Sequence, residues 1–182
     1  MSGTQTDRLQ ELLTGLRLVK TAVELPKLLQ DAGKKDMSHA DFLEEVLSRE
    51  TTAKGERQTL VRTTMARLPF HKSLESFDFK QQPSLDPKAI KELATGRFIA
   101  NAENALLLGP PGVGKTHLAV GLGLKACAQG YRTTFTTAAA LIGNLQRAQT
   151  EGRLEERLKQ LVQPKLLIVD EIRSEERRVG KE

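Results

Sequence analysis

The chain of 182 residues has one cysteine, one tyrosine and no tryptophan. The single cysteine, Cys127, excludes an intrachain disulfide and a cysteine-based metal cluster, and we expect it to be a small core residue. So few large aromatic residues give no support to a platform on which the bases of single-stranded nucleic acid stack. No apolar run approaches the length of a membrane span, and the N-terminus lacks the charged-then-apolar pattern of a signal peptide. We therefore expect a cytoplasmic protein without a membrane partner.

What is present suffices for a globular core. Hydrophobic residues make up 38% of the chain and charged residues 28%. The length allows one domain with a smaller appendage. The net charge of +5 is mildly basic, which permits a nucleic-acid partner without requiring one.

The most informative stretch runs from Gly109 to Thr116 and matches the phosphate-binding loop pattern G-x-x-x-x-G-K-[ST]. The apolar run at 105–108 predicts a buried strand before it, and residues 117–128 predict a helix after it. The glycines allow a tight turn whose backbone amides point at the phosphate oxygens of ATP. The alternative is an ordinary glycine-rich turn. The expected nucleotide-binding residues are Gly109, Pro110, Pro111, Gly112, Val113, Gly114, Lys115, Thr116 and, on the following helix, His117.

Two side chains of this loop have expected chemical roles. Lys115 should reach the β- and γ-phosphates, and the Thr116 hydroxyl should ligate Mg²⁺. The apolar run at 165–169 predicts a strand that ends at Asp170 and Glu171. Asp170 would hold Mg²⁺ through its water shell and Glu171 would polarise the attacking water, so Glu171 and Lys115 are the candidate catalytic residues. The competing interpretation is a buried strand that merely ends at exposed acids.

Three aromatic side chains near these motifs have two interpretations each. His117 follows the loop on its helix, where a packing role is favoured over a catalytic one. Phe77 and Phe79 either pack on the nucleotide-binding domain or line an adenine pocket, and packing is again the simpler interpretation.

The pattern along the chain predicts four segments. Residues 1–69 predict a helical N-terminal domain for DNA or partner binding. Ser38 should cap a helix there, with Asp41 in the capping-box position. Residues 70–88 predict a linker, residues 89–172 a partial ATP-binding domain, and residues 173–182 a disordered or artefactual tail. The N-terminal domain begins with an apolar stripe at helical spacing formed by Leu9, Leu12, Leu13, Leu16, Val19 and Val23.

Strands and helices alternate in the ATP-binding domain. A helix is predicted over 90–99, a strand over 133–136, and helices over 138–148 and 153–162 that are split at Gly152. Gly130 should close the helix that follows the phosphate loop. This alternation predicts an α/β fold with a parallel, doubly wound sheet and a ligand at the carboxyl ends of its strands.

Residues 54–72 are basic, with Glu56 as the only acid among them. The cations spread around the predicted helix instead of forming one stripe. Contact of Arg57, Arg62 and Arg67 with the phosphates of double-stranded DNA and a merely solvated helix surface therefore both stay open.

The stretches at 109–119, 130–131, 135–138 and 166–171 resemble the IstB-type ATP-binding proteins of insertion sequences. The resemblance implies a P-loop NTPase of the AAA+ class, whose parallel sheet has helices on both faces, behind a small all-α N-terminal domain. It implies ATP and Mg²⁺ as cofactors, a homo-oligomer on double-stranded DNA, and a transposase as the protein partner. The Lys-Thr-His-Leu-Ala extension at 115–119 is shared with helicase loaders, so a helicase-loading ATPase is the alternative.

After Glu171 the sequence departs from that family. The last ten residues contain one apolar residue and resemble a translated sequencing adapter. The family's sheet continues past this point with a central strand, and its sensor residues and arginine finger follow. We therefore expect an incomplete sheet and poor ATP hydrolysis from the chain as written. A non-catalytic nucleotide-binding or interaction fragment is the third possibility.

Overall fold

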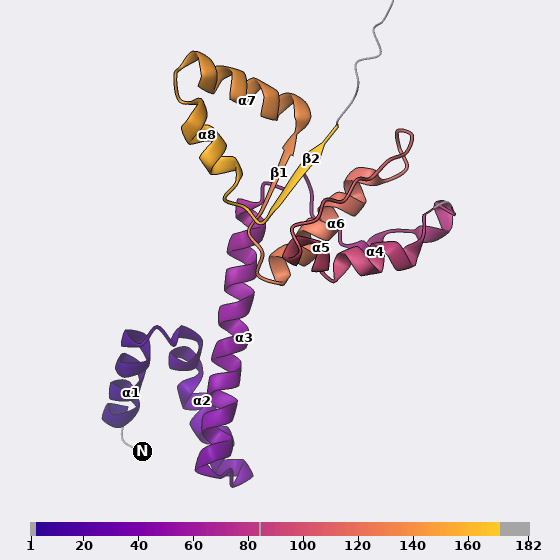
Figure 1. Cartoon of the computed structure of the whole chain (residues 1–182). Coiled ribbons are helices and arrows are strands. Elements are labelled where there is room, and N and C mark those ends of the chain that lie inside the picture. The colour runs from indigo at the N-terminus through magenta and orange to yellow at the C-terminus, as the bar shows by residue number, and fades with distance from the viewer. Residues whose placement is uncertain (1–2, 84, 172–182) are drawn as a thin grey trace, which may run out of the picture. The chain divides into compact units, whose positions relative to one another are not determined.

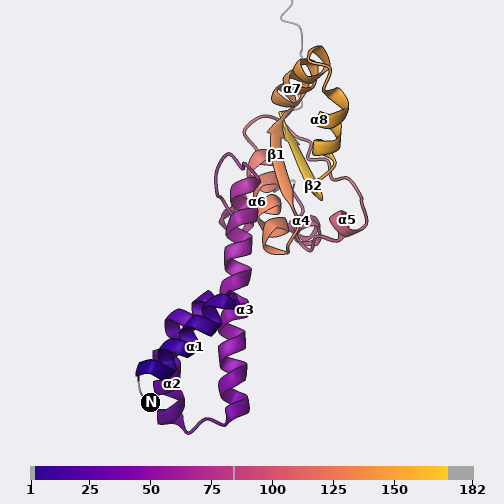
Figure 2. The same ribbon diagram turned by 90° about the vertical axis from the view of Figure 1, so that its left-hand side faces the viewer.

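The computed structural model describes residues 3–83 and 85–171, which fall into two compact units (Figures 1 and 2). The first unit ends at Gln58 and the second begins at Thr59, so that helix α3 (His39–Met65) contributes to both. Residues 172–182, which include the predicted tail, lie outside the described residues. In the part of the chain that is described, none of the helices combines the length and apolar character needed to cross a lipid bilayer.

The division lies earlier than residue 69, where we expected it, because the end of α3 belongs to the second unit. The Arg62 guanidinium donates to the Cys127 carbonyl at 2.8 Å. The backbone amide of Phe135 donates to the Ala66 carbonyl, also at 2.8 Å. These bonds join the last turns of α3 to a helix and a strand far along the chain, which local sequence patterns do not reveal.

The first unit contains α1 (Gly3–Gly15), α2 (Val19–Lys35) and the first part of α3. The predicted apolar stripe is interrupted, because the chain turns at Arg17 with a positive φ of 59° and starts a new helix. Leu12, Leu16 and Val23 of that stripe are exposed. The buried apolar side chains of this unit are Ala22, Leu25, Leu28 and Val46. The stripe therefore does not form one continuous buried face.

Polar side chains fix the starts of two helices in this unit. Ser38 caps α3 as predicted, accepting a bond from the Asp41 amide at 3.2 Å and donating to the Asp41 carboxylate at 2.7 Å. α2 has no side-chain cap of its own at Leu18. The buried carboxylate of Glu50 serves instead, accepting bonds from the Thr21 amide at 2.8 Å and the Thr21 hydroxyl at 3.2 Å. A residue of α3 thus satisfies an amide that the first turn of α2 leaves without a partner.

The carboxylate of Glu50 also accepts a bond from the Arg57 guanidinium at 3.1 Å. Burial disfavours the charged carboxylate, but the bonds from Thr21 and the charge of Arg57 outweigh it, so the pKa of Glu50 lies below its ordinary value. Glu50 is therefore ionised inside the protein, and its charge is fully partnered.

After the end of α3, the second unit continues with the segment predicted as a linker, which has short helical turns of its own. It contains the 3₁₀ turns η1 (Leu74–Ser76) and η2 (Phe79–Gln81). α4 (Pro87–Ala94) begins at an Asp86 cap, and α5 (Arg97–Ala100) follows it. The single helix predicted over 90–99 is two helices, because Gly96 adopts a φ of 77° between them. Leu74 belongs to a buried cluster with Ile90, Leu118 and Leu122.

The remaining elements follow the predicted order closely. They are α6 (Lys115–Ala128), β1 (Thr133–Thr137), α7 (Ala138–Thr150), α8 (Leu154–Leu161) and β2 (Leu166–Asp170). β1 and β2 lie side by side as a parallel pair, with Thr133 opposite Leu166 and Thr137 opposite Asp170 (Figures 1 and 2). Cys127 is buried as expected. The fold is mixed α/β with a short parallel sheet, which confirms the predicted class.

The predicted strand before the phosphate loop is wrong. Residues 105–108 form no strand, and the side chains of Leu106 and Leu108 are 71% and 82% exposed. A strand needs a hydrogen-bonding neighbour, and within the described residues β1 and β2 pair only with each other. Leu106 and Leu108 therefore lie at the surface, whereas Leu107 packs against the buried cluster around Leu74.

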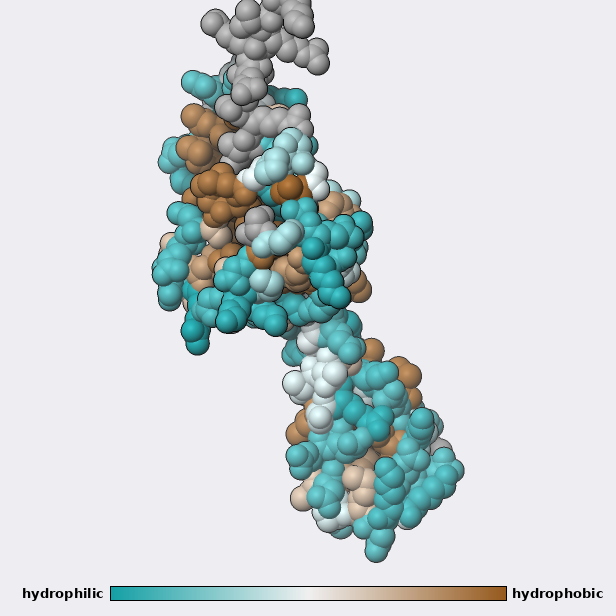
Figure 3. All heavy atoms as spheres, turned by 90° about the vertical axis from the view of Figure 1, so that its right-hand side faces the viewer, coloured by the Kyte–Doolittle hydropathy of each residue, from teal (hydrophilic) through white to brown (hydrophobic). Residues whose placement is uncertain are grey.

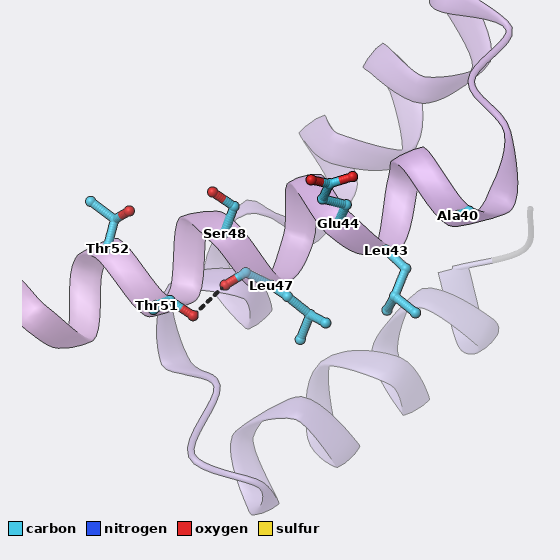
Figure 4. A pocket seen from close by; sticks show the side chains of 7 residues that line it. All are labelled: Ala40, Leu43, Glu44, Leu47, Ser48, Thr51 and Thr52. Carbon is cyan, nitrogen blue, oxygen red and sulfur yellow. Dashed lines mark hydrogen bonds between the residues drawn. The ribbon is translucent and has the colours of Figure 1, made fainter.

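Apolar surface is present on both units, where brown patches interrupt the hydrophilic teal (Figure 3). One shallow hollow of about 570 Å³ lies on α3 in the first unit. Leu43 and Leu47 project from one side of that helix, whereas Glu44, Ser48 and Thr52 project from the other (Figure 4). Glu44 is the one charged residue that lines this hollow, and no lysine or arginine lines it to bind phosphate. The phosphate-binding motif lies in the second unit.

Candidate nucleotide-binding site

The phosphate loop is held in an open turn between residues 109 and 114. Gly112 and Gly114 adopt φ values of 83° and 89°, a left-handed conformation that favours glycine over any other residue. Within the described part of the chain, the amides of Gly112, Val113 and Gly114 donate to no backbone carbonyl. α6 begins directly after this turn and presents its N-terminus to the same place. The loop therefore offers unpaired amides and a partial positive charge to an anion.

Lys115, the first residue of α6, folds back over its own loop. Its ammonium donates to the carbonyls of Gly109 and Pro110, both at 2.7 Å. These two carbonyl oxygens are neutral acceptors, and a phosphate would be a stronger, charged partner for the same ammonium. The lysine is thus positioned at the loop and can exchange these carbonyls for phosphate oxygens.

Thr116 and Asp170 are brought together from residues far apart in the sequence. The Thr116 hydroxyl donates to the Asp170 carboxylate at 2.8 Å, joining the start of α6 to the end of β2. α6 approaches β2 closely because it has glycine at position 123, where an added Cβ would lie 2.8 Å from the Ile168 Cδ1 atom. The sequence predicted both residues as magnesium ligands, and the structure places them side by side.

The chemistry of this pair fits Mg²⁺. A hydroxyl and a carboxylate are hard oxygen ligands, and Mg²⁺ takes few of them from the protein and the rest from phosphates and water. The described residues contain no cluster of three or more His, Cys, Asp or Glu side chains, which would be expected for a cation held by protein alone. Thr116 and Asp170 are thus two described residues that could supply protein ligands to such an ion.

Glu171 follows directly after β2 and is exposed. Its φ of 55° is left-handed, which costs a residue with a side chain roughly 1–2 kcal/mol. Glu171 is thus a carboxylate next to Asp170 in the sequence, and its role in polarising water stays a prediction.

The polar contacts of His117 are to residues 73 and 76 and not to the phosphate loop. Its Nε2 atom lies 3.0 Å from the Ser73 carbonyl oxygen and 3.2 Å from the Ser76 hydroxyl. Phe77 packs near the loop instead, because its ring occupies the space beside Gly114. Sequence reasoning missed this Phe77–His117 neighbourhood, with ring centroids 5.2 Å apart, since the two residues belong to separate segments.

Two of the three arginines that are candidates for DNA contact have partners inside the protein. Arg57 pairs with Glu50 in the first unit, although its side chain stays 51% exposed. Arg62 donates to the carbonyl of Cys127 and to the hydroxyl of Thr59. Arg67 adopts a φ of 56° just beyond the end of α3. Arg57 and Arg62 therefore have structural roles that the basic pattern did not show.

The geometry can be compared with known proteins. Residues 11–176 match the family described as IstB-like ATP binding protein. The chain belongs to this family. It is 43% identical over 164 residues to a Pseudomonas aeruginosa protein whose name describes an ATP-binding protein of insertion sequence IS21, covering 90% of this chain and 62% of that relative. It is 42% identical over 168 residues to a similarly named IS5376 protein of Geobacillus stearothermophilus, covering 91% and 66%.

A third relative has the same kind of name. The IS232 protein of Bacillus thuringiensis subsp. berliner is 35% identical over 166 residues, covering 90% of this chain and 66% of its own length. The chain thus spans slightly less than two thirds of these relatives. The matched region includes the phosphate loop and the end of β2, so membership of the IstB-like family rests on the same residues as the site.

Proposed function

We propose that this chain binds ATP with Mg²⁺ and serves as the ATP-binding component of a DNA transposition system. The observation that carries the proposal is the Thr116–Asp170 bond of 2.8 Å, which joins the phosphate loop to the end of β2. A glycine-rich turn without a nucleotide function has no reason to place a hydroxyl and a carboxylate together beside open amides. The family membership and the names of the relatives support ATP as the nucleotide.

Each residue has one task in this proposal. The loop amides bind the phosphate oxygens, and Lys115 moves from the carbonyls of Gly109 and Pro110 to the β- and γ-phosphates. Thr116 and Asp170 hold Mg²⁺, which would neutralise charge on the phosphates when bound. Glu171 accepts a hydrogen bond from a water molecule and orients it toward the γ-phosphate. The protein contributes mainly by positioning, which is the larger part of phosphoryl-transfer catalysis.

The nucleotide part of the proposal is tested by titrating ATP in the presence of Mg²⁺. Lys115→Ala should lose most of the affinity, because it removes the charged partner of the phosphates. Lys91→Ala, which removes an exposed lysine of α4, is the matched control and should bind like the wild type. Equal ATP affinity in the wild type and Lys115→Ala would refute the proposed site.

Double-stranded DNA, a transposase and further copies of this chain are the proposed macromolecular partners. The support comes from the insertion-sequence names of the relatives and from the basic residues at 54–72. Because Arg57 and Arg62 also hold the fold together, the cleaner test replaces Lys54 and Arg67 with glutamine. If both contact phosphates, the slope of log affinity against log salt should fall by about 2. An unchanged slope would leave these residues as solvated surface.

A further inference from the structure

Residues 73–79 form a strap along one face of α6. The N-cap residue and three helix positions contact it, at the three- and four-residue spacing that shares a helix face: Gly114, His117, Gly121 and Lys125. The first of these is the glycine that precedes α6 in the phosphate loop. The strap therefore starts its contacts at the loop itself and continues down the helix.

Polar contacts tie the strap to the helix at two levels. Near the loop, His117 Nε2 lies 3.0 Å from the Ser73 carbonyl, which only accepts, so Nε2 carries the hydrogen and donates it. The Ser76 hydroxyl also donates to the Ser73 carbonyl, at 2.7 Å. Further down, Lys125 pairs with Glu75 at 2.6 Å and lowers the pKa of that carboxyl to about 2.

Apolar contacts leave no space between the strap and the helix. A Cβ added to Gly121 would lie 2.6 Å from the Leu74 side chain and 3.1 Å from its backbone nitrogen. A Cβ added to Gly114 would lie 2.6 Å from the Phe77 ring. The Phe79 ring packs against the Phe77 ring, with ring centroids 4.9 Å apart. The Phe77 ring thus fills the space beside the glycine whose left-handed backbone shapes the loop.

We propose that this strap is a positioning element for nucleotide binding, in which Phe77 and His117 keep the phosphate loop in its binding conformation before the nucleotide arrives. The inference rests on the proposed ATP site. A loop with unpaired amides and a partly exposed lysine has few bonds of its own to hold its shape. If losing a strap contact reduces the competent fraction of the loop to about a tenth, the apparent Kd rises about tenfold.

The test compares substitutions that remove a contact with substitutions that preserve it. His117→Leu keeps the volume and loses the donor, whereas His117→Gln keeps an N–H donor for the Ser73 carbonyl. Phe77→Ala removes the ring beside Gly114. We expect His117→Leu and Phe77→Ala to raise the Kd for MgATP and for MgADP about tenfold each, and His117→Gln to restore affinity to within about threefold of the wild type.

Hydrogen exchange of the nucleotide-free protein supplies a second readout. The amides of residues 109–116 should exchange faster in His117→Leu and Phe77→Ala, while those of β1 stay as protected as in the wild type. The matched control, Glu92→Gln, breaks the exposed ion pair with Arg97 outside the strap and should change neither the Kd nor loop exchange. Circular dichroism checks that each variant is folded.

Two results would overturn the inference. Unchanged Kd and loop exchange in both variants would show that the strap is dispensable. Faster exchange in β1 and the loop alike would show a general loss of stability, without a specific effect on the loop. Failure of the wild type to bind MgATP would instead refute the ATP proposal, and the exchange comparison, which needs no nucleotide, would still decide whether the strap holds the loop.

Discussion

Replacing the buried Glu50 with glutamine should destabilise the helical first unit. The carboxylate receives bonds from the Thr21 amide, the Thr21 hydroxyl and the Arg57 guanidinium. Hydrogen bonds to a charged group contribute roughly 1.5–3 kcal/mol each and neutral ones about 0.5–1.5 kcal/mol. Glutamine keeps an acceptor for the Thr21 amide and is cheaper to bury. We therefore expect a net loss of about 2 kcal/mol for Glu50→Gln.

Alanine at the same position should cost more, about 3–5 kcal/mol, because it leaves the Thr21 amide and Arg57 without their partner. The assay is urea unfolding followed by far-UV circular dichroism. Glu44→Gln, an exposed glutamate on the same helix, is the matched control and should stay within about 0.5 kcal/mol of the wild type. Equal midpoints for Glu50→Gln and Glu44→Gln would refute the role given to Glu50.

Three further outcomes are expected. In a version of the protein that turns over ATP, Glu171→Gln should keep ATP binding and slow phosphate release by about 10²–10⁴, and unchanged release would remove Glu171 from the mechanism. The pKa of Glu75 lies near 2, below its ordinary 4.5, so its pairing with Lys125 stabilises the fold above about pH 4.5 and is lost as the pH falls from 4.5 to 2. Glu75→Gln should therefore flatten the dependence of the urea midpoint on pH in that window. Parallel curves for the wild type and the variant would contradict this. Gly123→Ala should destabilise by about 1–3 kcal/mol, because the new Cβ meets Ile168, whereas Gly143→Ala in open space should be neutral or stabilising in the same assay.

Sequence patterns predicted the elements whose signals are local. β1, β2, α7 and α8 appear where apolar periodicity and Gly152 indicated, and the Ser38 cap forms as expected. The pairing of Thr116 with Asp170 could be anticipated, because parallel strands place ligands at their carboxyl ends.

The rest depended on partners far along the chain. An apolar run such as 105–108 becomes a strand only when a neighbour pairs with it. For Arg62 the sequence left DNA contact and a solvated surface both open, but its acceptor is a carbonyl 65 positions away. Glu50 carried no local signal at all, since it caps a helix that ends before its own helix begins. Tertiary contacts, and not propensity, decided these residues.

The most direct test of the nucleotide site is a double-mutant cycle on the two proposed magnesium ligands. ATP affinity is measured with and without Mg²⁺ for the wild type, Thr116→Val, Asp170→Asn and the double variant. If one ion is shared, each single variant should lose most of the Mg²⁺-dependent gain in affinity, and the double variant should be no weaker than the worse single variant. Strictly additive losses, or a Mg²⁺-dependent gain that survives in the double variant, would contradict a magnesium site built by Thr116 and Asp170.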